Sequence, residues 1–348
     1  MRIRLTYEPA LTAGWPLFRQ SPRGAGVWGD AAFVPSSEDT SAFDYWVVVD
    51  DLKAPEQALV PPERVVLVTC EPTPMRLYHP RFLEQFGLIV TTQERIDGPN
   101  VLHTQLGLPW HVGVRRRVGQ GGGTLTDDVA TLGYDELRVI ALEKSRELSV
   151  VCGGEERTEG QRLRLALIDR LQAHFGSRLD VYGRDSNPVE DKWDAVAPYR
   201  FQLVLENSAE PHYFTEKLTD AYLGGCFPLY WGCPNLDDYF ERDAYEPIDV
   251  HDPDGAIATI ERVLGEGVTP VRAAALERAR HAVLEHYNLF PALLSVLAHC
   301  PAGQPRRVRL KSQAAFRRGP WRRRATFRLR SSLSGLRHRH AATASSLD

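Results

Sequence analysis

Short apolar runs alternate with polar, turn-forming segments along the first hundred residues. Four of these runs are rich in β-branched residues: MRIRLTY (1–7), YWVVVDD (45–51), RVVLVTCE (64–71) and FGLIVTT (86–92). Runs of this length and composition, bounded by turn residues, predict β-strands. Because they are apolar on both faces, they are typical of a parallel sheet covered by helices.

A Gly- and Arg-rich break, RRRVGQGGGTLT (115–126), is interpreted as an interdomain linker, with a helix predicted at about 135–144. The alternation then resumes. The strands predicted after the break are LSVVCGG (148–154), LDVYG (179–183), FQLVLEN (201–207) and CFPLYWG (226–232), and the helices are 159–176, 215–225, 254–267 and 271–287. Alternation on both sides of a linker predicts two Rossmann-like α/β domains facing a cleft. The predicted boundaries are 1–114, a linker and connecting helix at 115–143, a second domain at 144–300 and a tail at 301–348.

The strand at 201–205 ends abruptly in Glu206, Asn207 and Ser208. Ligands of open α/β sheets lie at the carboxyl ends of the strands. These polar groups are therefore predicted to face the cleft.

The helix that follows is predicted to begin at Thr215, a residue type favoured as an N-cap. Its free N–H groups and its dipole attract anions. Lys217 opposes that dipole unless a pyrophosphate is bound, whereas Glu216 fits the dipole and can accept hydrogen bonds from sugar hydroxyls. Five of the 42 Lys and Arg residues are lysines, so a lysine here is a hint of function. The alternative is an ordinary N-cap beside a solvated lysine.

The overall composition is that of a globular protein, with 43% hydrophobic and 25% charged residues among 348. No apolar window is long enough for a transmembrane helix, and the N-terminus lacks the apolar core of a secretory signal. The five cysteines are scattered without CxxC spacing, which argues against a disulfide framework or a zinc site. A cytoplasmic location is expected.

The net charge of −3 hides a strong asymmetry. Residues 301–348 carry 13 Lys and Arg and one acid, which leaves 29 bases against 44 acids in residues 1–300. Arginines interleaved with aromatic residues over 305–340 favour attachment to an anionic membrane surface, here the inner membrane face. Nonspecific nucleic-acid binding and a solvated tail are the alternatives; no specific nucleic acid is expected.

Residues 199–240 closely resemble the donor-site signature of the α1,3/1,4-fucosyltransferases, glycosyltransferase family 10. The matching residues, in chain order, are Glu206, Asn207, Ser208, Tyr213, Thr215, Glu216, Lys217, Asp220, Ala221, Pro228, Tyr230 and Gly232. The resemblance extends over about residues 144–270. It implies a GT-B arrangement of two nucleotide-binding-like domains, GDP-fucose as the donor, inversion at the anomeric carbon and no catalytic metal or other cofactor.

The resemblance also implies roles for individual residues. Tyr213, Glu216 and Lys217 match donor-binding residues of the family, with Lys217 on the diphosphate and Glu216 on sugar hydroxyls. Asn207 matches an amide of the same pocket, and Glu206 is a further candidate.

An arginine of the first helix of this domain contacts the diphosphate in the family. Arg164 matches it best by spacing, and Arg162 and Arg157 are the alternatives. Without a metal, the charge that develops on the leaving diphosphate must be neutralised by such cations and by a helix N-terminus.

Inversion also needs a base that takes the proton of the acceptor hydroxyl. The family's suggested base is a glutamate of the N-terminal domain, and its place here is Glu71 in LVTCEPTPM. Burial at a strand end can raise the pKa of such a carboxyl. His111 is the rival. Asp252-Pro253-Asp254 is a literal Asp-x-Asp, which a metal-dependent transferase would use, but we interpret it as a helix cap.

The function expected from the sequence is therefore fucosyl transfer from GDP-fucose to a hydroxyl of a glycan acceptor. Residues 1–114 would form the acceptor side and residues 144–300 the donor side. The acceptors expected are precursors of surface glycans. The alternatives are a transferase for another nucleotide sugar and a non-catalytic sugar-nucleotide-binding protein.

Overall fold

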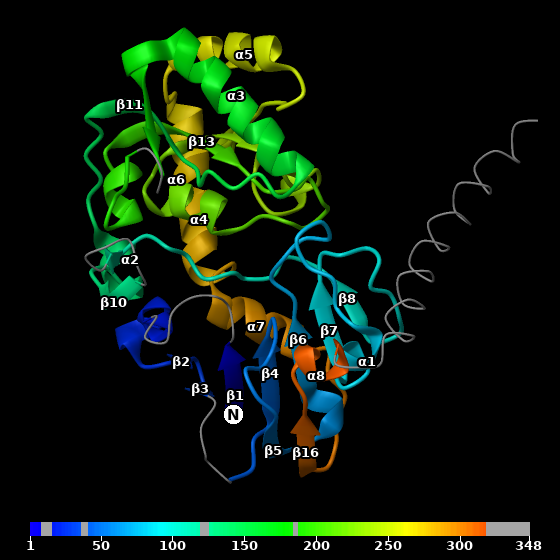
Figure 1. Cartoon of the computed structure of the whole chain (residues 1–348). Helices are drawn as coiled ribbons and strands as arrows, with labels where there is room; N and C mark the ends of the chain where they lie inside the picture. The colour runs from blue at the N-terminus through cyan, green and yellow to red at the C-terminus, as the bar shows by residue number, and fades with distance from the viewer. Residues whose placement is uncertain (8–15, 36–40, 119–124, 184–186, 318–348) are drawn as a thin grey trace, which may run out of the picture.

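The computed structural model describes residues 1–7, 16–35, 41–118, 125–183 and 187–317. Its lower unit in Figure 1 is built on a seven-stranded sheet of order β2-β3-β1-β4-β6-β7-β8. All neighbours in this sheet are parallel except β2 and β3. The strands are β1 (Arg2–Tyr7), β2 (Val27–Trp28), β3 (Ala31–Pro35), β4 (Tyr45–Val49), β6 (Val65–Val68), β7 (Leu88–Thr91) and β8 (Val101–His103). The four strands predicted in this region are confirmed.

The upper unit contains a five-stranded parallel sheet of order β12-β11-β13-β14-β15. The strands are β11 (Arg146–Val151), β12 (Leu179–Tyr182), β13 (Tyr199–Leu205), β14 (Phe227–Trp231) and β15 (Glu246–Pro247), and the helices are α3 (Glu159–Phe175), α4 (Glu216–Leu223), α5 (Pro253–Glu266) and α6 (Pro270–Glu285). The predicted strands and helices of this half are confirmed, with ends shifted by a few residues.

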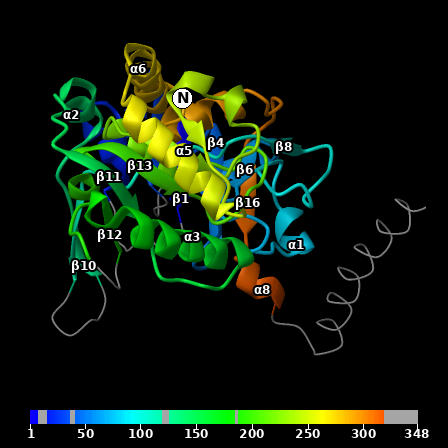
Figure 2. The ribbon, with the colours of Figure 1, turned by 90° about the horizontal axis from the view of Figure 1, so that it is seen from above.

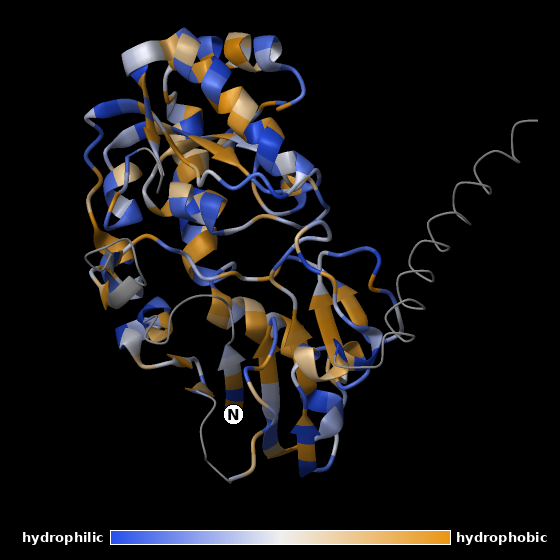
Figure 3. Ribbon diagram, in the orientation of Figure 1, coloured by the Kyte–Doolittle hydropathy of each residue, from blue (hydrophilic) through white to orange (hydrophobic). Residues whose placement is uncertain are grey.

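Helices cover both faces of this sheet. Leu167 of α3 and Ile260 of α5 pack on one face, where Figure 2 shows the two helices side by side. Leu218 of α4 and Val283 of α6 pack on the other. Strands buried on both faces must be apolar, and Figure 3 shows β13 as mainly hydrophobic. The expected fold class, two Rossmann-like α/β units in the GT-B manner, is confirmed.

The region predicted as a linker has more structure than expected. β9 (Val114–Val118) and β10 (Leu125–Ala130) form an antiparallel pair, and α2 (Tyr134–Val139) is shorter than the helix predicted at 135–144. β9 and β10 are held together by backbone hydrogen bonds. The arginine run at 115–117 does not indicate a strand, so this pairing was not predicted from the sequence.

The C-terminal part of the chain returns to the lower unit. α7 (Leu289–Leu297) inserts Phe290 and Leu293 into the core beside Ile3 and Val66. β16 (Arg306–Leu310) pairs antiparallel with β5 (Glu56–Val60), and α8 (Gln313–Arg317) packs near α1 (Pro80–Leu83).

The structure therefore differs from the predicted boundary at residue 300, because residues 289–317 belong with the N-terminal unit. An apolar helix signals burial but not the sheet against which it packs. Residues 318–348 of the predicted tail lie outside the described residues. Within the part of the chain that is described, no helix is long and apolar enough to cross a membrane.

Candidate active site

The turn from β13 into α4 is organised by a buried carboxylate. Glu206 is 0% exposed. Its two oxygens accept hydrogen bonds from the Thr215 N–H and from the Thr215 hydroxyl, both at 2.8 Å. Thr215 is the N-cap of α4 and its hydroxyl oxygen accepts a hydrogen bond from the Lys217 N–H at 3.3 Å. Glu206 thus joins the end of the strand to the start of the helix.

Gly232 allows this close approach. A Cβ at Gly232 would lie 2.5 Å from the Glu206 Cγ and 2.5 Å from the Tyr230 hydroxyl oxygen. The Tyr230 hydroxyl oxygen in turn accepts a hydrogen bond from the Cys233 N–H at 2.8 Å. Gly232, one of the residues that match the family signature, is therefore required by packing against Glu206.

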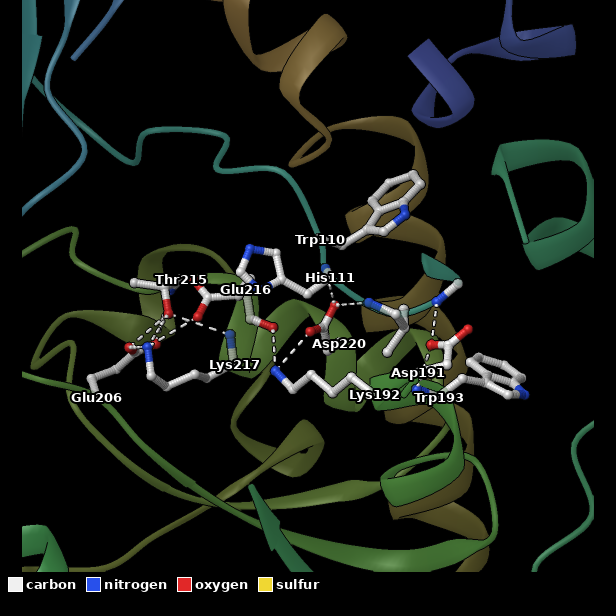
Figure 4. Close-up of polar contacts among 12 residues, drawn as sticks. Trp110, His111, Asp191, Lys192, Trp193, Glu206, Thr215, Glu216, Lys217 and Asp220 are labelled. Carbon is white, nitrogen blue, oxygen red and sulfur yellow. Dashed lines mark hydrogen bonds and ion pairs between the residues drawn. The ribbon is translucent and has the colours of Figure 1, made fainter. Parts of the chain in front are cut away.

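Lys217 lies between two carboxylates. Its Nζ is 3.4 Å from Glu206 Oε2 and 3.2 Å from Glu216 Oε1, as Figure 4 shows. Burial opposes the ammonium charge, but these carboxylates outweigh it and raise the pKa of Lys217. Lys217 is therefore a permanent cation at the first turn of α4.

Glu216 is ionised because the positive charges around it outweigh the effect of its burial. Burial acts to raise its pKa, but the nearby charges of Lys217, His111 and Lys192 lower it well below the usual range. The carboxylate can therefore only accept hydrogen bonds, which suits contact with hydroxyl groups.

Arg164 of α3 reaches the same sheet edge. Its Nη1 donates to Asn207 Oδ1 at 2.6 Å, and its buried Nε has no hydrogen-bond partner in the described part of the chain. Arg162 and Arg157 are exposed and contact Glu156 and Glu155 instead. Of the three arginines considered from the sequence, Arg164 is the one that the structure brings to the cluster.

The sheet order explains why these residues meet. The order β12-β11-β13 places a topological switch point between β11 and β13, where the following helices α3 and α4 lie on opposite faces. Ligands bind at such points. Gly160 permits the approach, since a Cβ there would lie 2.3 Å from the Asn207 carbonyl oxygen.

Tyr213 is buried near the carboxylates of several glutamates. Its side chain is 2% exposed, and burial together with the charges of Glu206, Glu71 and Glu216 raises its pKa well above the usual range. The phenol therefore stays protonated and is available as a hydrogen-bond donor.

Glu71 reaches this cluster from the other unit, just beyond the carboxyl end of β6. It is half-buried, and within the described part of the chain its carboxylate has no hydrogen bond or ion pair. Burial and the charges of Asp50 and Glu216 raise its pKa, while Lys217 and Arg76 act in the opposite direction. The two units also bond directly here, because the Thr73 N–H donates to Glu210 Oε1 at 3.0 Å.

His111, the rival base, also lies beside Glu216 (Figure 4). Its backbone N–H and that of Val112 donate to Asp220 Oδ1 at 2.9 and 3.2 Å, and Asp220 is paired with Lys192 at 2.7 Å. Asp220 thereby attaches the segment between the two sheets to α4.

Several residues of this region were not selected from the sequence. They are Tyr7, Asp50, Arg76 and Lys192. Tyr7 ends β1 and Asp50 directly follows β4, so the carboxyl-edge rule that selected the residues after β13 could have found them. Lys192 is one of the five lysines of the chain, so the scarcity of lysine that pointed to Lys217 points to it as well.

The Asp-x-Asp triplet lies away from this site. Asp252 is the N-cap of α5 and accepts the Gly255 N–H at 3.0 Å, while Asp254 pairs with Arg170 at 2.6 Å. The interpretation as a helix cap is confirmed. Among the residues that the structure describes, no three His, Cys, Asp or Glu side chains are grouped so that they could hold a metal ion.

Comparison with known proteins supports the assignment of the upper unit. Residues 144–260 match the sequence profile described as "Glycosyltransferase family 10 (fucosyltransferase) C-term". These residues are therefore similar to the C-terminal domain of the family 10 fucosyltransferases. The matched segment, called the family 10 domain below for the profile that it matches, includes Arg164, Asn207 and Lys217, whereas Glu71 and His111 lie outside it.

Curated relatives match over shorter segments. The alpha-(1,3)-fucosyltransferase FucT of Helicobacter pylori is 36% identical over 64 residues, which cover 18% of this chain and 13% of the relative. The human 3-galactosyl-N-acetylglucosaminide 4-alpha-L-fucosyltransferase FUT3 is 29% identical over 113 residues, 31% of each chain. This chain therefore spans less than a third of either relative.

A crystal structure of an alpha1,3-fucosyltransferase with GDP is 15% identical to this chain, with a TM-score of 0.42 over 83% of this chain and 93% of that one.

Proposed function

We propose that the protein is an inverting glycosyltransferase that transfers fucose from GDP-fucose to a hydroxyl group of a glycan acceptor. The observation that carries this proposal is the meeting of Arg164, Asn207 and Lys217 at the switch point of the family 10 domain, with Glu71 of the other unit within electrostatic range of Lys217. The relatives are named for fucosyl transfer, which indicates the sugar.

The diphosphate leaving group would be held by cations from two helices. Arg164 has a buried Nε without a hydrogen-bond partner among the described residues, and Lys217 is kept charged by its neighbours. The first N–H groups of α4 add a third positive element. Preorganised donors of this kind stabilise negative charge as it develops on a departing group. No step of this scheme requires a metal.

Glu71 is the proposed general base. An inverting displacement needs the acceptor hydroxyl on the side of the sugar opposite the diphosphate. Glu71 belongs to the unit that faces the donor cluster, and its raised pKa makes it a better proton acceptor than an ordinary carboxylate. His111 is kept as the second candidate, because it also lies at Glu216.

The test is calorimetric titration with GDP, UDP, ADP and GDP-fucose in the presence of EDTA. We expect GDP and GDP-fucose to bind and the other nucleotides to bind weakly or not at all. Fucosyl transfer is then measured with a 3-galactosyl-N-acetylglucosaminide, the acceptor in the name of the human relative FUT3. Binding of another nucleotide, or a metal requirement, would replace fucose as the proposed sugar. No binding at all would favour a non-catalytic protein.

The proposed site of action is the cytoplasmic face of an anionic membrane, on the precursors of surface glycans. The edge strand β16 and the residue after it expose Arg306, Arg307, Arg309 and Lys311. Cations on one edge attract anionic lipid headgroups. Because β16 is part of the lower unit, any test of membrane binding must leave residues 306–317 in place.

A further inference from the structure

The loop that carries Glu71 is held at both ends by one buried amide. Gln93 is 0% exposed, and its Nε2 donates to the carbonyl oxygens of Glu71 at 2.7 Å and of Arg76 at 3.0 Å. Between these points the chain turns tightly, with the Met75 and Arg76 N–H groups both donating to the Pro72 carbonyl. Both donor positions of the Gln93 amide are therefore used to close this turn.

Arg76 fixes the same loop from the opposite side. Its guanidinium bridges two consecutive carboxylates: it pairs with Asp50 and lies 2.8 Å from Asp51 Oδ2. The hydroxyl of Tyr78 also donates to Asp50. A planar guanidinium fork that spans two carboxylates restricts both distance and orientation.

Asp50 itself has an unusual backbone. Its φ is +73°, a left-handed conformation that non-glycine residues rarely adopt, and the residue is 4% exposed. Such residues persist where the surrounding structure requires a particular side-chain direction, and they cluster at active sites. Here the direction places a buried carboxylate within electrostatic range of Glu71.

We propose that Gln93 and the Asp50–Arg76 pair are positioning residues for Glu71, which they hold toward the donor cluster of the family 10 domain. This inference rests on the proposed function. Gln93 fixes the Glu71 backbone and Arg76 fixes the far end of the turn. The side chain of Glu71 is left free of hydrogen bonds within the described chain, as a proton acceptor must be.

The charged and titratable groups around Glu71 come from every element packed near it. They are Asp50 after β4, Cys70 and Arg76 on its own segment, and Tyr213, Glu216 and Lys217 of the upper unit. Burial is the largest influence on the Glu71 pKa, and it raises it. Release of the loop into water therefore lowers that pKa.

The test is Gln93→Met, which keeps the volume of the side chain and removes both donors. We expect kcat for fucosyl transfer to fall by about tenfold to a hundredfold, because a base displaced by about 1 Å loses this much. We also expect the acidic limb of the kcat–pH profile to move to lower pH, while the affinity for GDP changes by less than about twofold. A merely structural glutamine would not move the pH profile.

The matched control is Gln202→Met. Gln202 is a buried glutamine of β13, 2% exposed, whose Oε1 has no hydrogen-bond partner among the described residues. We expect it to leave the pH profile of kcat unchanged. If Gln93→Met does not fold, Arg76→Lys decides instead, since Arg76 is partly exposed and lysine keeps its charge without the fork.

An unchanged kcat and pH profile in the variant that folds would overturn the inference. So would a loss of kcat that is matched by an equal loss of GDP affinity. A wild-type protein that binds no GDP and transfers no fucose would instead refute the proposed function, so the two failures are distinguishable.

Discussion

Lys217→Met is the substitution whose outcome the geometry defines most closely. It removes a cation that lies 3.4 Å from Glu206, 3.2 Å from Glu216 and 3.1 Å from the Thr215 hydroxyl oxygen. Two effects follow, one on donor binding and one on folding.

For donor binding, the loss is that of a hydrogen bond between charged groups, about 1.5–3 kcal/mol. At 1.4 kcal/mol for each factor of ten, GDP should bind about 10- to 100-fold more weakly. For folding, Glu206 loses its cation but keeps both hydrogen bonds from Thr215. The destabilisation should therefore be about 1–3 kcal/mol, below that of a fully orphaned buried charge.

The pH dependence follows from Glu206. Burial already raises its pKa, and Lys217 is the main group that lowers it. In the variant this folded-state pKa rises further above the unfolded value. Over the pH range between these two pKa values of Glu206, the native state binds more protons than the unfolded state. The free energy of unfolding therefore falls as the pH rises through this range. The variant should be least stable, relative to the wild type, at neutral pH.

The assay combines calorimetric titration with GDP in EDTA and urea denaturation at pH 5 and pH 8. Lys311→Met, which removes an exposed lysine of the other unit, is the matched control. GDP affinity within about twofold of the wild type, in a variant that folds, would refute the placement of Lys217 on the diphosphate.

Three further outcomes are expected. Glu71→Gln should lower kcat by about 10²- to 10⁴-fold with GDP affinity unchanged; measured beside it, a larger loss of kcat in His111→Gln would transfer the role of base to His111. Deletion of residues 318–348 should keep the thermal transition and GDP binding but weaken sedimentation with anionic vesicles, because it removes eight of the 13 bases of residues 301–348 and leaves those of 306–317; undiminished sedimentation would exclude residues 318–348 from the membrane proposal. Gly232→Ala should destabilise the protein by about 1–3 kcal/mol in urea denaturation, because its Cβ would lie 2.5 Å from Glu206; an unchanged urea midpoint would contradict the packing argument.

Local sequence signals were sufficient for the elements of the family 10 domain. The helix at 159–176 was predictable because Leu163, Leu167 and Leu171 share one face and Gly176 can end it; α3 ends at Phe175, with Gly176 as its C-cap. The polar residues after β13 were predictable as site residues, since a parallel strand delivers its carboxyl end to the ligand-binding edge. Both inferences use interactions between residues close in sequence.

The role of Glu206 needed the tertiary structure. From the sequence it is a further donor-binding candidate, but the structure occupies both of its oxygens with Thr215 and places Gly232 against it. Such contacts depend on the relative position of two strands and a helix, which no local pattern encodes. The choice among Arg157, Arg162 and Arg164 also needed the tertiary structure, because only packing decides which of these arginines reaches Asn207.

The sequence by itself therefore determined the alternation of strands and helices, the position of the donor signature and the chemical character of the residues at the strand ends. Only the tertiary structure decided that residues 289–317 return to the first unit, that Gln93 closes the loop of Glu71, and that Glu71 lies within electrostatic range of Lys217. The physical reason is range. Periodicity and capping act over a few residues, whereas these contacts join segments that are tens to hundreds of residues apart and form only when the two sheets pack together.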